Sequence, residues 1–221
     1  MKNCILFVRG TYRAGHLGFY KRLCHSKVRI AVDGGYSFFK RAGLRPDVLM
    51  GDFDSVAGLP RKLSPQTRVI KFPVRKDKTD SQLAVEYCIE HKARNIDMVM
   101  PGVGDMDHFI GNLMLLTSSK VTDWVKRGGR IRVLSARGGL RFAKDGGAIF
   151  RNAVGDTVSV IPLSQRIILS WTGTDYDVEK VSLRRGESRS LRNRVRSRRA
   201  IVTVEGEAFI WRGFAGKPRI D

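Results

Sequence analysis

The chain has 221 residues, which is enough for one large domain or two small ones, and its 42% hydrophobic content can build a core. Its 41 lysines and arginines outnumber its 21 aspartates and glutamates, and the net charge of +20 is compatible with an anionic partner such as nucleic acid. No run approaches the roughly 20 apolar residues that span a membrane, and the apolar stretch 5–8 is too short for a signal peptide, so we expect a cytoplasmic protein without membrane contact.

The first part of the chain alternates strand patterns with helix patterns. Apolar periodicity at helical spacing predicts helices over 16–25, 35–43 and 80–93, the second ending at Gly43 and the third capped by Asp80 or Ser81. Short apolar runs that end in Gly, Pro or Asp predict strands at 4–10, 28–35, 47–55, 68–73 and 96–102. This alternation predicts an α/β domain over residues 1–132, with a mostly parallel sheet and helices on both faces.

After about residue 130 the pattern changes to strands alone. Runs separated by Gly, Asn and Asp turns predict strands at 131–135, 147–153, 156–163, 166–171, 175–183 and 200–213, and no segment has a helical pattern. We therefore expect a smaller all-β sandwich domain over residues 133–221, joined to the first domain where glycines cluster between 128 and 140.

The densest run of positive charge lies at 184–200, with eight arginines and one glutamate. Arginine alternates there with other residues, as on the solvent-exposed face of a strand, so a solvated strand and loop explains the run. A polyanion-binding patch, or a contact to a substrate phosphate or to a second subunit, are the alternatives.

Acidic residues concentrate at the predicted strand ends. In an open parallel sheet the ligand crevice lies beyond the carboxyl ends of the strands. Asp52 and Asp54 alternate along an extended segment, so both carboxylates face one point, and like charges at that distance repel unless a cation lies between them. Mg²⁺ is the expected cation, although any single aspartate could instead cap a helix or a turn. Eight of the twelve acids in residues 1–128 lie in such segments: Asp33, Asp47, Asp52, Asp54, Asp77, Asp80, Asp105 and Asp107.

Segment 72–84 places basic residues beside acids at a predicted helix start. Arg75, Lys76 and Lys78 lie next to Asp77 and Asp80. Cations beside metal-binding carboxylates, together with the N–H groups of a helix N-terminus, suit a polyphosphate. Taken alone, the segment could also be an exposed charged loop with a helix cap.

Segment 101–112 repeats the order of strand end, glycines, acids and helix. Asp107 and His108 are expected in the first helical turn, with Asn112 one turn further on the His108 face. A plain N-cap and an exposed histidine are the alternative for the first two. No Walker A loop and no dinucleotide fingerprint follows the first strand, so metal, lysine and helix ends must hold any phosphates.

These motifs together resemble the thiamine pyrophosphokinase (thiamine diphosphokinase) family over about residues 30–117. The matching segments are "DGG" at 33–35, "PD" at 46–47, "GDFDS" at 51–55, "KDKTD" at 76–80 with "LA" at 83–84, and "DH" at 107–108 followed by Asn112 and Leu115. The resemblance implies an α/β catalytic domain followed by a β-sandwich that helps to bind thiamine, usually in a homodimer. It also implies transfer of diphosphate from ATP, the co-substrate, to the thiamine hydroxyl with release of AMP, with Mg²⁺ as cofactor.

The resemblance assigns roles to individual residues. Carried over by position, the metal ligands are Asp52, Asp54 and Asp80; the residues around the phosphates and the pocket are Asp33, Lys76, Asp77, Thr79, Asp107, His108 and Asn112; and the thiamine contacts are Tyr176 and Asn193. Asp52, Asp54, Asp80 and Asp107 form the expected catalytic set.

The chain departs from the family pattern at two positions. Asp105 stands where many relatives have an arginine, and Arg192 stands where they have a serine. Asp105 removes a phosphate-facing cation unless another arginine replaces it. Arg192 puts the identity of the acceptor in question. The motifs therefore support diphosphate transfer more strongly than thiamine as the acceptor. The alternatives are a diphosphokinase for another hydroxymethyl heterocycle, such as a pterin, and a non-catalytic basic protein that binds a polyanion on the same scaffold.

Overall fold

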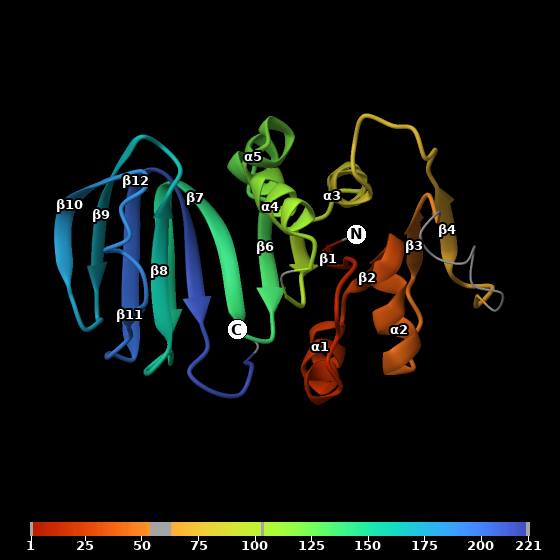
Figure 1. The fold of residues 1–221 in the computed structure, drawn as a ribbon, viewed down its shortest axis with the longest axis horizontal. Helices are drawn as coiled ribbons and strands as arrows, with labels where there is room; N and C mark the ends of the chain where they lie inside the picture. Colours follow the sequence, from red (N-terminus) through yellow and green to blue (C-terminus); the bar gives the residue numbers. More distant parts are fainter. Residues whose placement is uncertain (1, 54–62, 103, 220–221) are drawn as a thin grey trace. The chain divides into compact units, whose positions relative to one another are not determined.

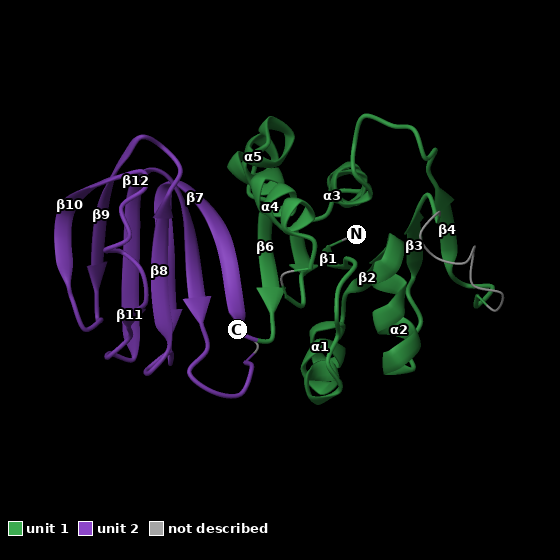
Figure 2. Ribbon diagram, viewed as in Figure 1, with its two compact units in different colours: residues 1–136 green, residues 137–221 purple. Residues whose placement is uncertain are grey.

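The computed structural model describes residues 2–53, 63–102 and 104–219 (Figure 1). The chain divides into two units, Met1–Ala136 and Arg137–Asp221 (Figure 2). The boundary expected at 132/133 falls inside a strand, β6 (Arg130–Ser135), which pairs in parallel with β5 of the first unit and so extends that unit. No helix in the described residues is long and apolar enough to cross a membrane.

Unit 1 is an α/β domain whose described strands are all parallel, in the order β6-β5-β1-β2-β3-β4. The remaining strands are β1 (Asn3–Phe7), β2 (Val28–Val32), β3 (Val48–Gly51), β4 (Arg68–Lys71) and β5 (Asn95–Val99). The helices are α1 (Leu17–Leu23), α2 (Tyr36–Ala42), α3 (Asp80–Glu90), α4 (Met106–Met114) and α5 (Ser119–Lys126), with short 3-10 turns at Ala14–His16, Asp33–Gly35 and Leu115–Thr117.

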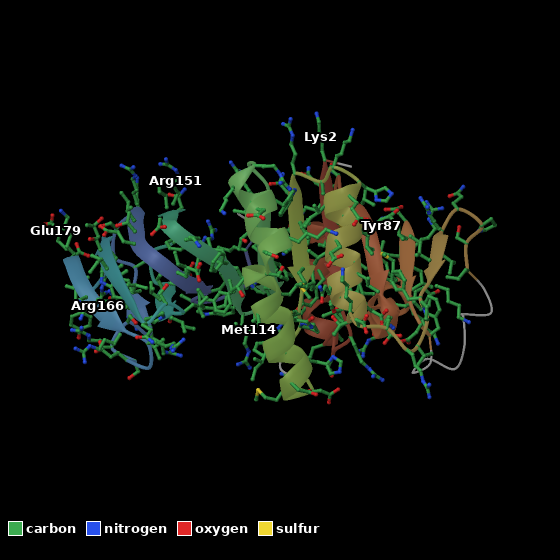
Figure 3. The ribbon with its side chains drawn as sticks, turned by 90° about the horizontal axis from the view of Figure 1, so that it is seen from above. Lys2, Tyr87, Met114, Arg151, Arg166 and Glu179 are labelled. Atoms are coloured by element: carbon green, nitrogen blue, oxygen red, sulfur yellow. The ribbon has the colours of Figure 1, made fainter. Side chains whose placement is uncertain are left out.

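The chain reverses its direction across the sheet between β1 and β5. From β1 it proceeds outward through β2 and β3 to β4, and then returns to β5 on the other side of β1. Right-handed crossovers place α1 and α2 on one face and α3, α4 and α5 on the other, as Figure 1 shows. Tyr87 of α3 and Met114 of α4 lie on this second face in Figure 3. Such a reversal opens a crevice at the carboxyl ends of the two adjacent strands.

An aromatic cluster holds the end of β1 in place. Phe7 stacks on Phe38 of α2 with ring centroids 4.0 Å apart, and Tyr12 and Tyr20 pack around Phe38 at 5.2 and 6.1 Å. All four side chains are buried, and offset or edge contacts of this kind add to their burial energy. The residues that follow β1 are therefore anchored against α2.

Three local predictions need correction. The second strand ends at Val32, because Asp33 has φ 45° and starts a 3-10 turn instead of continuing the extended chain. The cap of α3 is Thr79, whose side chain accepts from the Gln82 N–H at 3.2 Å; Asp80 is already the first helical residue. Helix α5 was not expected from the pattern. Gly43 does end α2, with φ 61°.

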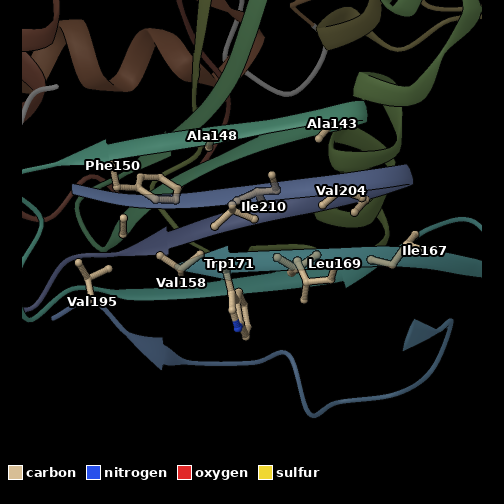
Figure 4. Close-up of a cluster of buried hydrophobic side chains, with 14 of the residues drawn as sticks. Ala143, Ala148, Phe150, Val158, Ile167, Leu169, Trp171, Val195, Val204 and Ile210 are labelled. Carbon is tan, nitrogen blue, oxygen red and sulfur yellow. The ribbon is translucent and has the colours of Figure 1, made fainter. Parts of the chain in front are cut away.

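Unit 2 is antiparallel and contains no helix in its described residues 137–219, as expected. Strand β12 pairs with β7, β9 and β8, and a register shift at Val204/Glu207 divides it into two halves. Side chains from both halves and from the neighbouring strands meet in one core around Trp171, Ile210 and Phe150 (Figure 4). The strands are β7 (Gly138–Arg151), β8 (Thr157–Pro162), β9 (Arg166–Thr172), β10 (Val178–Arg184), β11 (Asn193–Arg194) and β12 (Arg199–Gly213).

Candidate active site

A cavity of about 840 Å³ lies at the carboxyl ends of the unit 1 strands. It is built from the segments that follow β1, β2, β3 and β5 and from the loop that leads into α3. Its polar lining includes Asp33, Asp52, Asp77, Asp80, Asp105, Arg9, Lys76, Lys78, Thr79, His108 and Asn112. The structure thus brings most of the residues singled out in the sequence into one cavity.

Lys76 lies between two of the predicted metal ligands. Its Nζ is 2.6 Å from Asp52 Oδ2 and 3.3 Å from Asp80 Oδ1, and all three side chains are largely buried. Desolvation acts to lower the pKa of Lys76, but the contacts with Asp52 and Asp80 outweigh it and raise that pKa. The two carboxylates therefore share one cation.

The carboxylates crowd one another in spite of that cation. Burial raises the pKa of Asp80, Lys76 opposes the rise, and the charges of Asp52 and Asp33 add to it. Gly51 permits this crowding, because a Cβ there would lie 3.1 Å from the Asp33 Cα, closer than ordinary side-chain contacts. The end of β3 and the turn after β2 can therefore approach each other.

A second ion-pair group fixes the start and the middle of α3. Glu86 accepts from Lys78 at 2.8 Å, from Lys120 at 3.0 Å and from Gln82 at 3.0 Å. Desolvation alone would raise the pKa of Glu86, but these donors lower it to about 2. Lys78 lines the cavity, yet its charge is already matched by Glu86.

Residues in and just before α4 line two adjoining hollows. Asp105, His108 and Asn112 line the main cavity, whereas Asp107 lines an adjoining hollow of about 440 Å³ that shares Thr79, His108 and Asn112 with it. Asp107 lies in the first turn of α4, as predicted, and its Oδ1 accepts from the His108 N–H at 2.8 Å. Asp105 is the N-cap residue but makes no capping hydrogen bond with its side chain.

The donor set fits a hard divalent cation, although the predicted ligand Asp54 lies outside the described residues. Among those residues, no group of three or more histidine, cysteine, aspartate or glutamate side chains is arranged to hold a metal ion. Asp52 and Asp80, however, already flank one ammonium group, and the long 3.3 Å contact with Lys76 is the contact that the structure gives the buried Asp80 Oδ1 within the described chain. Oxygen-only ligands beside a polyphosphate are typical of Mg²⁺.

The two residues predicted in unit 2 lie together, because Asn193 in β11 hydrogen-bonds to the turn that carries Tyr176. Asn193 is only 5% exposed; its Nδ2 donates to Thr174 Oγ1 and to the Tyr176 carbonyl, both at 2.9 Å, and its Oδ1 accepts from the Tyr176 N–H at 3.2 Å. The Tyr176 side chain is 75% exposed. Asn193 therefore holds the turn that presents the Tyr176 ring to solvent.

Arg9 is a charged cavity residue that the motifs did not single out. It lies two residues after the end of β1 and belongs to no motif, and only the strand order places this edge of the sheet at the crevice. A larger hollow of about 1080 Å³ includes Lys2, Asn3, Val28 and Arg29 at the amino ends of β1 and β2, away from the acidic group. The smaller cavity is the candidate site because it combines the crevice edge with the carboxylates.

A family model and a curated relative both show similarity to thiamin pyrophosphokinases. Residues 19–125 match the family model described as thiamin pyrophosphokinase, catalytic domain. Thiamine pyrophosphokinase of Bacillus subtilis (strain 168) is 29% identical over 170 residues, which cover 74% of this chain and 76% of the relative.

Solved structures with the same fold extend the likeness across both units. The crystal structure of thiamine pyrophosphokinase from Bacillus subtilis aligns with a TM-score of 0.80 at 25% identity, covering 96% of this chain and 99% of the other. The Geobacillus thermodenitrificans protein aligns with a TM-score of 0.76 at 25% identity, covering 99% and 100%. With its catalytic-domain match, its curated relative and its shared fold, the chain is similar to thiamin pyrophosphokinases across both units.

Proposed function

We propose that this protein is a thiamine diphosphokinase, which transfers diphosphate from ATP to the hydroxyl of thiamine and releases AMP. The observation that supports this most directly is the position of Lys76 between Asp52 and Asp80 at the crevice edge of the sheet. Carboxylates that share a cation beside a helix N-terminus form a site for a metal-bound polyphosphate.

Asp52 and Asp80, with Asp54 as a further proposed ligand, would hold Mg²⁺, which offsets charge on the phosphates when it is bound. Lys76 then contributes a fixed positive charge beside the same oxygens. Thr79, the cap of α3, and the first helical residues Asp80 and Ser81 line the same cavity, so this helix N-terminus is available to the phosphates. Asp33 and Asp77 line it, and Asn112 and His108 lie on its α4 side.

The reaction is an in-line attack of the acceptor hydroxyl on the β-phosphorus of ATP. A bond forms between the hydroxyl oxygen and the β-phosphorus, the bond from that phosphorus to the oxygen bridging to the α-phosphorus breaks, and AMP leaves. Such a transfer requires positioning and charge stabilisation and no covalent nucleophile. We assign the hydroxyl proton to Asp107, because the hollow that it lines adjoins the main cavity at His108 and Asn112.

The acceptor contacts are assigned to unit 2. An exposed aromatic ring such as Tyr176 suits stacking on a heterocycle, and Asn193 would keep that ring in position. The family resemblance supports a cytoplasmic homodimer in which unit 2 contributes to thiamine binding. A pterin acceptor is the alternative that the departure at Arg192 leaves open.

The test is incubation of the purified protein with ATP, Mg²⁺ and thiamine, with AMP and thiamine diphosphate separated by chromatography. The two products are expected in equal amounts, and neither should form without Mg²⁺. Formation of ADP and thiamine monophosphate would contradict the diphosphate transfer. Formation of AMP with a hydroxymethyl pterin but not with thiamine would contradict the acceptor and retain the chemistry.

A further inference from the structure

We propose that Arg9 binds the triphosphate of the nucleotide and adds a positive charge to those of the cavity lysines, which are already paired with carboxylates. This inference rests on the proposed function and adds to it a residue outside the motifs. Arg9 lines the same cavity as Asp33, Asp52 and Lys76. Four observations support the proposal: its place in the topology, the packing of its side chain, the charge balance of the cavity and the chemistry of guanidinium.

Arg9 lies at the point where the chain reverses across the sheet. β1 has β2 on one side and β5 on the other, and Phe7 pairs with Ala31 and Val99. Val8 continues the pairing through a hydrogen bond to the Val99 carbonyl, so Arg9 is the first residue that leaves the sheet at this edge. Ligands of open α/β sheets bind at such a reversal.

Gly34 leaves room for the Arg9 side chain. A Cβ on Gly34 would lie 2.8 Å from Arg9 Cγ, 3.2 Å from Cβ and 3.3 Å from Cδ. The aliphatic part of Arg9 therefore packs on the backbone beside Asp33. Packing of this kind limits the rotamers of a long side chain, so less entropy is lost when it binds a ligand.

The charge balance of the cavity leaves Arg9 available. Lys76 is 2.6 Å from Asp52 and 3.3 Å from Asp80, and Lys78 is 2.8 Å from Glu86. Among the lysines and arginines that line the cavity in the described chain, Arg9 alone has no carboxylate within ion-pair distance. Aspartates also line this cavity, so a triphosphate would meet strong repulsion without an uncommitted cation.

Guanidinium suits this role because it binds two phosphate oxygens at once through parallel N–H donors. A lysine at the same position would keep the charge but lose the paired geometry. The side chain at position 9 should therefore matter for the polyphosphate and not for the rest of the nucleotide.

The experiment measures binding of α,β-methylene ATP and of AMP, both with Mg²⁺, by titration calorimetry on the full chain. Arg9→Gln is expected to weaken binding of the triphosphate analogue about 10- to 100-fold, the range for a lost hydrogen-bonded charge. AMP affinity should change less than about twofold, and Arg9→Lys should lie between Arg9→Gln and the unchanged chain. Arg13→Gln is the matched control, because Arg13 is exposed in the same loop but does not line the cavity.

A second variant tests the packing. Gly34→Ala should weaken binding of the triphosphate analogue in the unchanged chain, but should add little in the Arg9→Gln background, since both changes remove one contact. Fully additive losses would contradict the role of Gly34 in placing Arg9.

Two results would overturn the inference and are distinguishable. If the unchanged protein forms AMP and thiamine diphosphate while Arg9→Gln binds the analogue equally well, the inference fails and the proposed function stands. If the unchanged protein neither binds the analogue nor forms AMP, the proposed function fails and the inference fails with it.

Discussion

Lys76 stabilises the cluster of aspartates at the crevice by reducing the repulsion between their charges. Asp52 and Asp80 lie close enough to contact the same ammonium group, and Asp33 adds a third charge that raises the pKa of Asp80 together with burial. Charges packed in this way repel, and a cation between them removes most of the cost. Lys76 therefore keeps Asp52 and Asp80 close together, and a metal ion would bind carboxylates that are already in place.

Replacing Lys76 by Gln is expected to lower kcat/KM about 100- to 1000-fold, the range for loss of a group that stabilises charge in the transition state. The variant should also be stabilised by Mg²⁺ more than the unchanged protein, because its carboxylates lack their lysine partner. Thermal unfolding with and without Mg²⁺ measures the second effect. Lys71→Gln, an exposed lysine on β4, is the control and should change neither quantity. Equal Mg²⁺ stabilisation of Lys76→Gln and the unchanged chain would contradict the shared cation site.

At the scale of elements, the sequence predicts which strands and helices occur better than it predicts where the strands end, since the five strands predicted in unit 1 each run two to four residues past the observed end. The alternation of apolar runs with segments of helical spacing was enough to predict the α/β unit and the helices α2 and α3. The cap of α3 differs by one or two positions, because Thr79, Asp80 and Ser81 can all cap a helix and only the backbone conformation selects Thr79. The site depends on the same elements, and five of the eight aspartates singled out in the sequence line the cavity.

Two features of the site could not be read from the sequence. Arg9 required the strand order, since only the adjacency of β1 and β5 shows that its edge is the crevice. Glu86 was also not predictable as a partner of Lys78, and it pairs as well with Lys120 of α5, a helix that the pattern did not predict. Contacts between distant segments determine which charges remain available for a ligand.

Helix α3 should contribute to stability in a pH-dependent way through Glu86. The pKa of Glu86 in the folded protein is about 2, below its ordinary value of 4.5, so its contribution to stability is complete above pH 4.5 and is lost as the pH falls toward 2. Glu86→Gln is expected to lower the free energy of unfolding by roughly 1 kcal/mol at pH 7, because both lysine partners are partly exposed.

Urea unfolding of both proteins between pH 7 and pH 3 measures this effect, and the difference between them should shrink as the pH falls. Glu90→Gln on the same helix is the control, since Glu90 is an exposed partner of Lys120, and it should cost less than about 0.5 kcal/mol. A difference between Glu86→Gln and the unchanged protein that is independent of pH would show that the charge of Glu86 does not stabilise α3.

Substitutions at Tyr176 and at Asn193, which holds the turn of Tyr176, should have different effects on thiamine binding and on stability. Tyr176→Ala removes an exposed ring, so the free energy of unfolding should change by less than about 0.5 kcal/mol while KM for thiamine rises about 3- to 10-fold, the range for a lost aromatic stack. Asn193→Ala should instead cost about 1 to 3 kcal/mol of stability, because it leaves buried polar partners unsatisfied. Chemical unfolding and steady-state kinetics measure the two effects. An unchanged KM in Tyr176→Ala would remove this residue from the acceptor site.

For the whole molecule, the arginine run at 184–200 is a source of exposed positive charge, because all eight of its arginines are exposed although Asn193 and Val195 between them are buried. Two of them have acidic partners: Arg189 is 3.0 Å from Glu187, and Arg196 pairs with Asp175. Register also sets Arg184 opposite Arg166 and Arg199 opposite Arg151, and Figure 3 shows Arg151 and Arg166 projecting from their strands. Like charges directly opposite on neighbouring strands are destabilising.

This surface predicts weak, salt-sensitive attraction to polyanions without a specific site. A gel shift with single-stranded RNA should show binding at low salt that disappears at moderate salt, as expected for phosphate contacts alone. Binding that persists at moderate salt, together with absence of AMP formation, would favour the polyanion-binding alternative over the enzyme.

The most direct measurement is a crystal structure of the protein with Mn²⁺ in place of Mg²⁺ and α,β-methylene ATP, using the anomalous signal of manganese to locate the metal. The proposed site predicts a metal peak bound by oxygens of Asp52 and Asp80, with the triphosphate beside it and in contact with Lys76 and Arg9. A metal or a triphosphate bound elsewhere, for example in the basic hollow at the amino ends of β1 and β2, would contradict it.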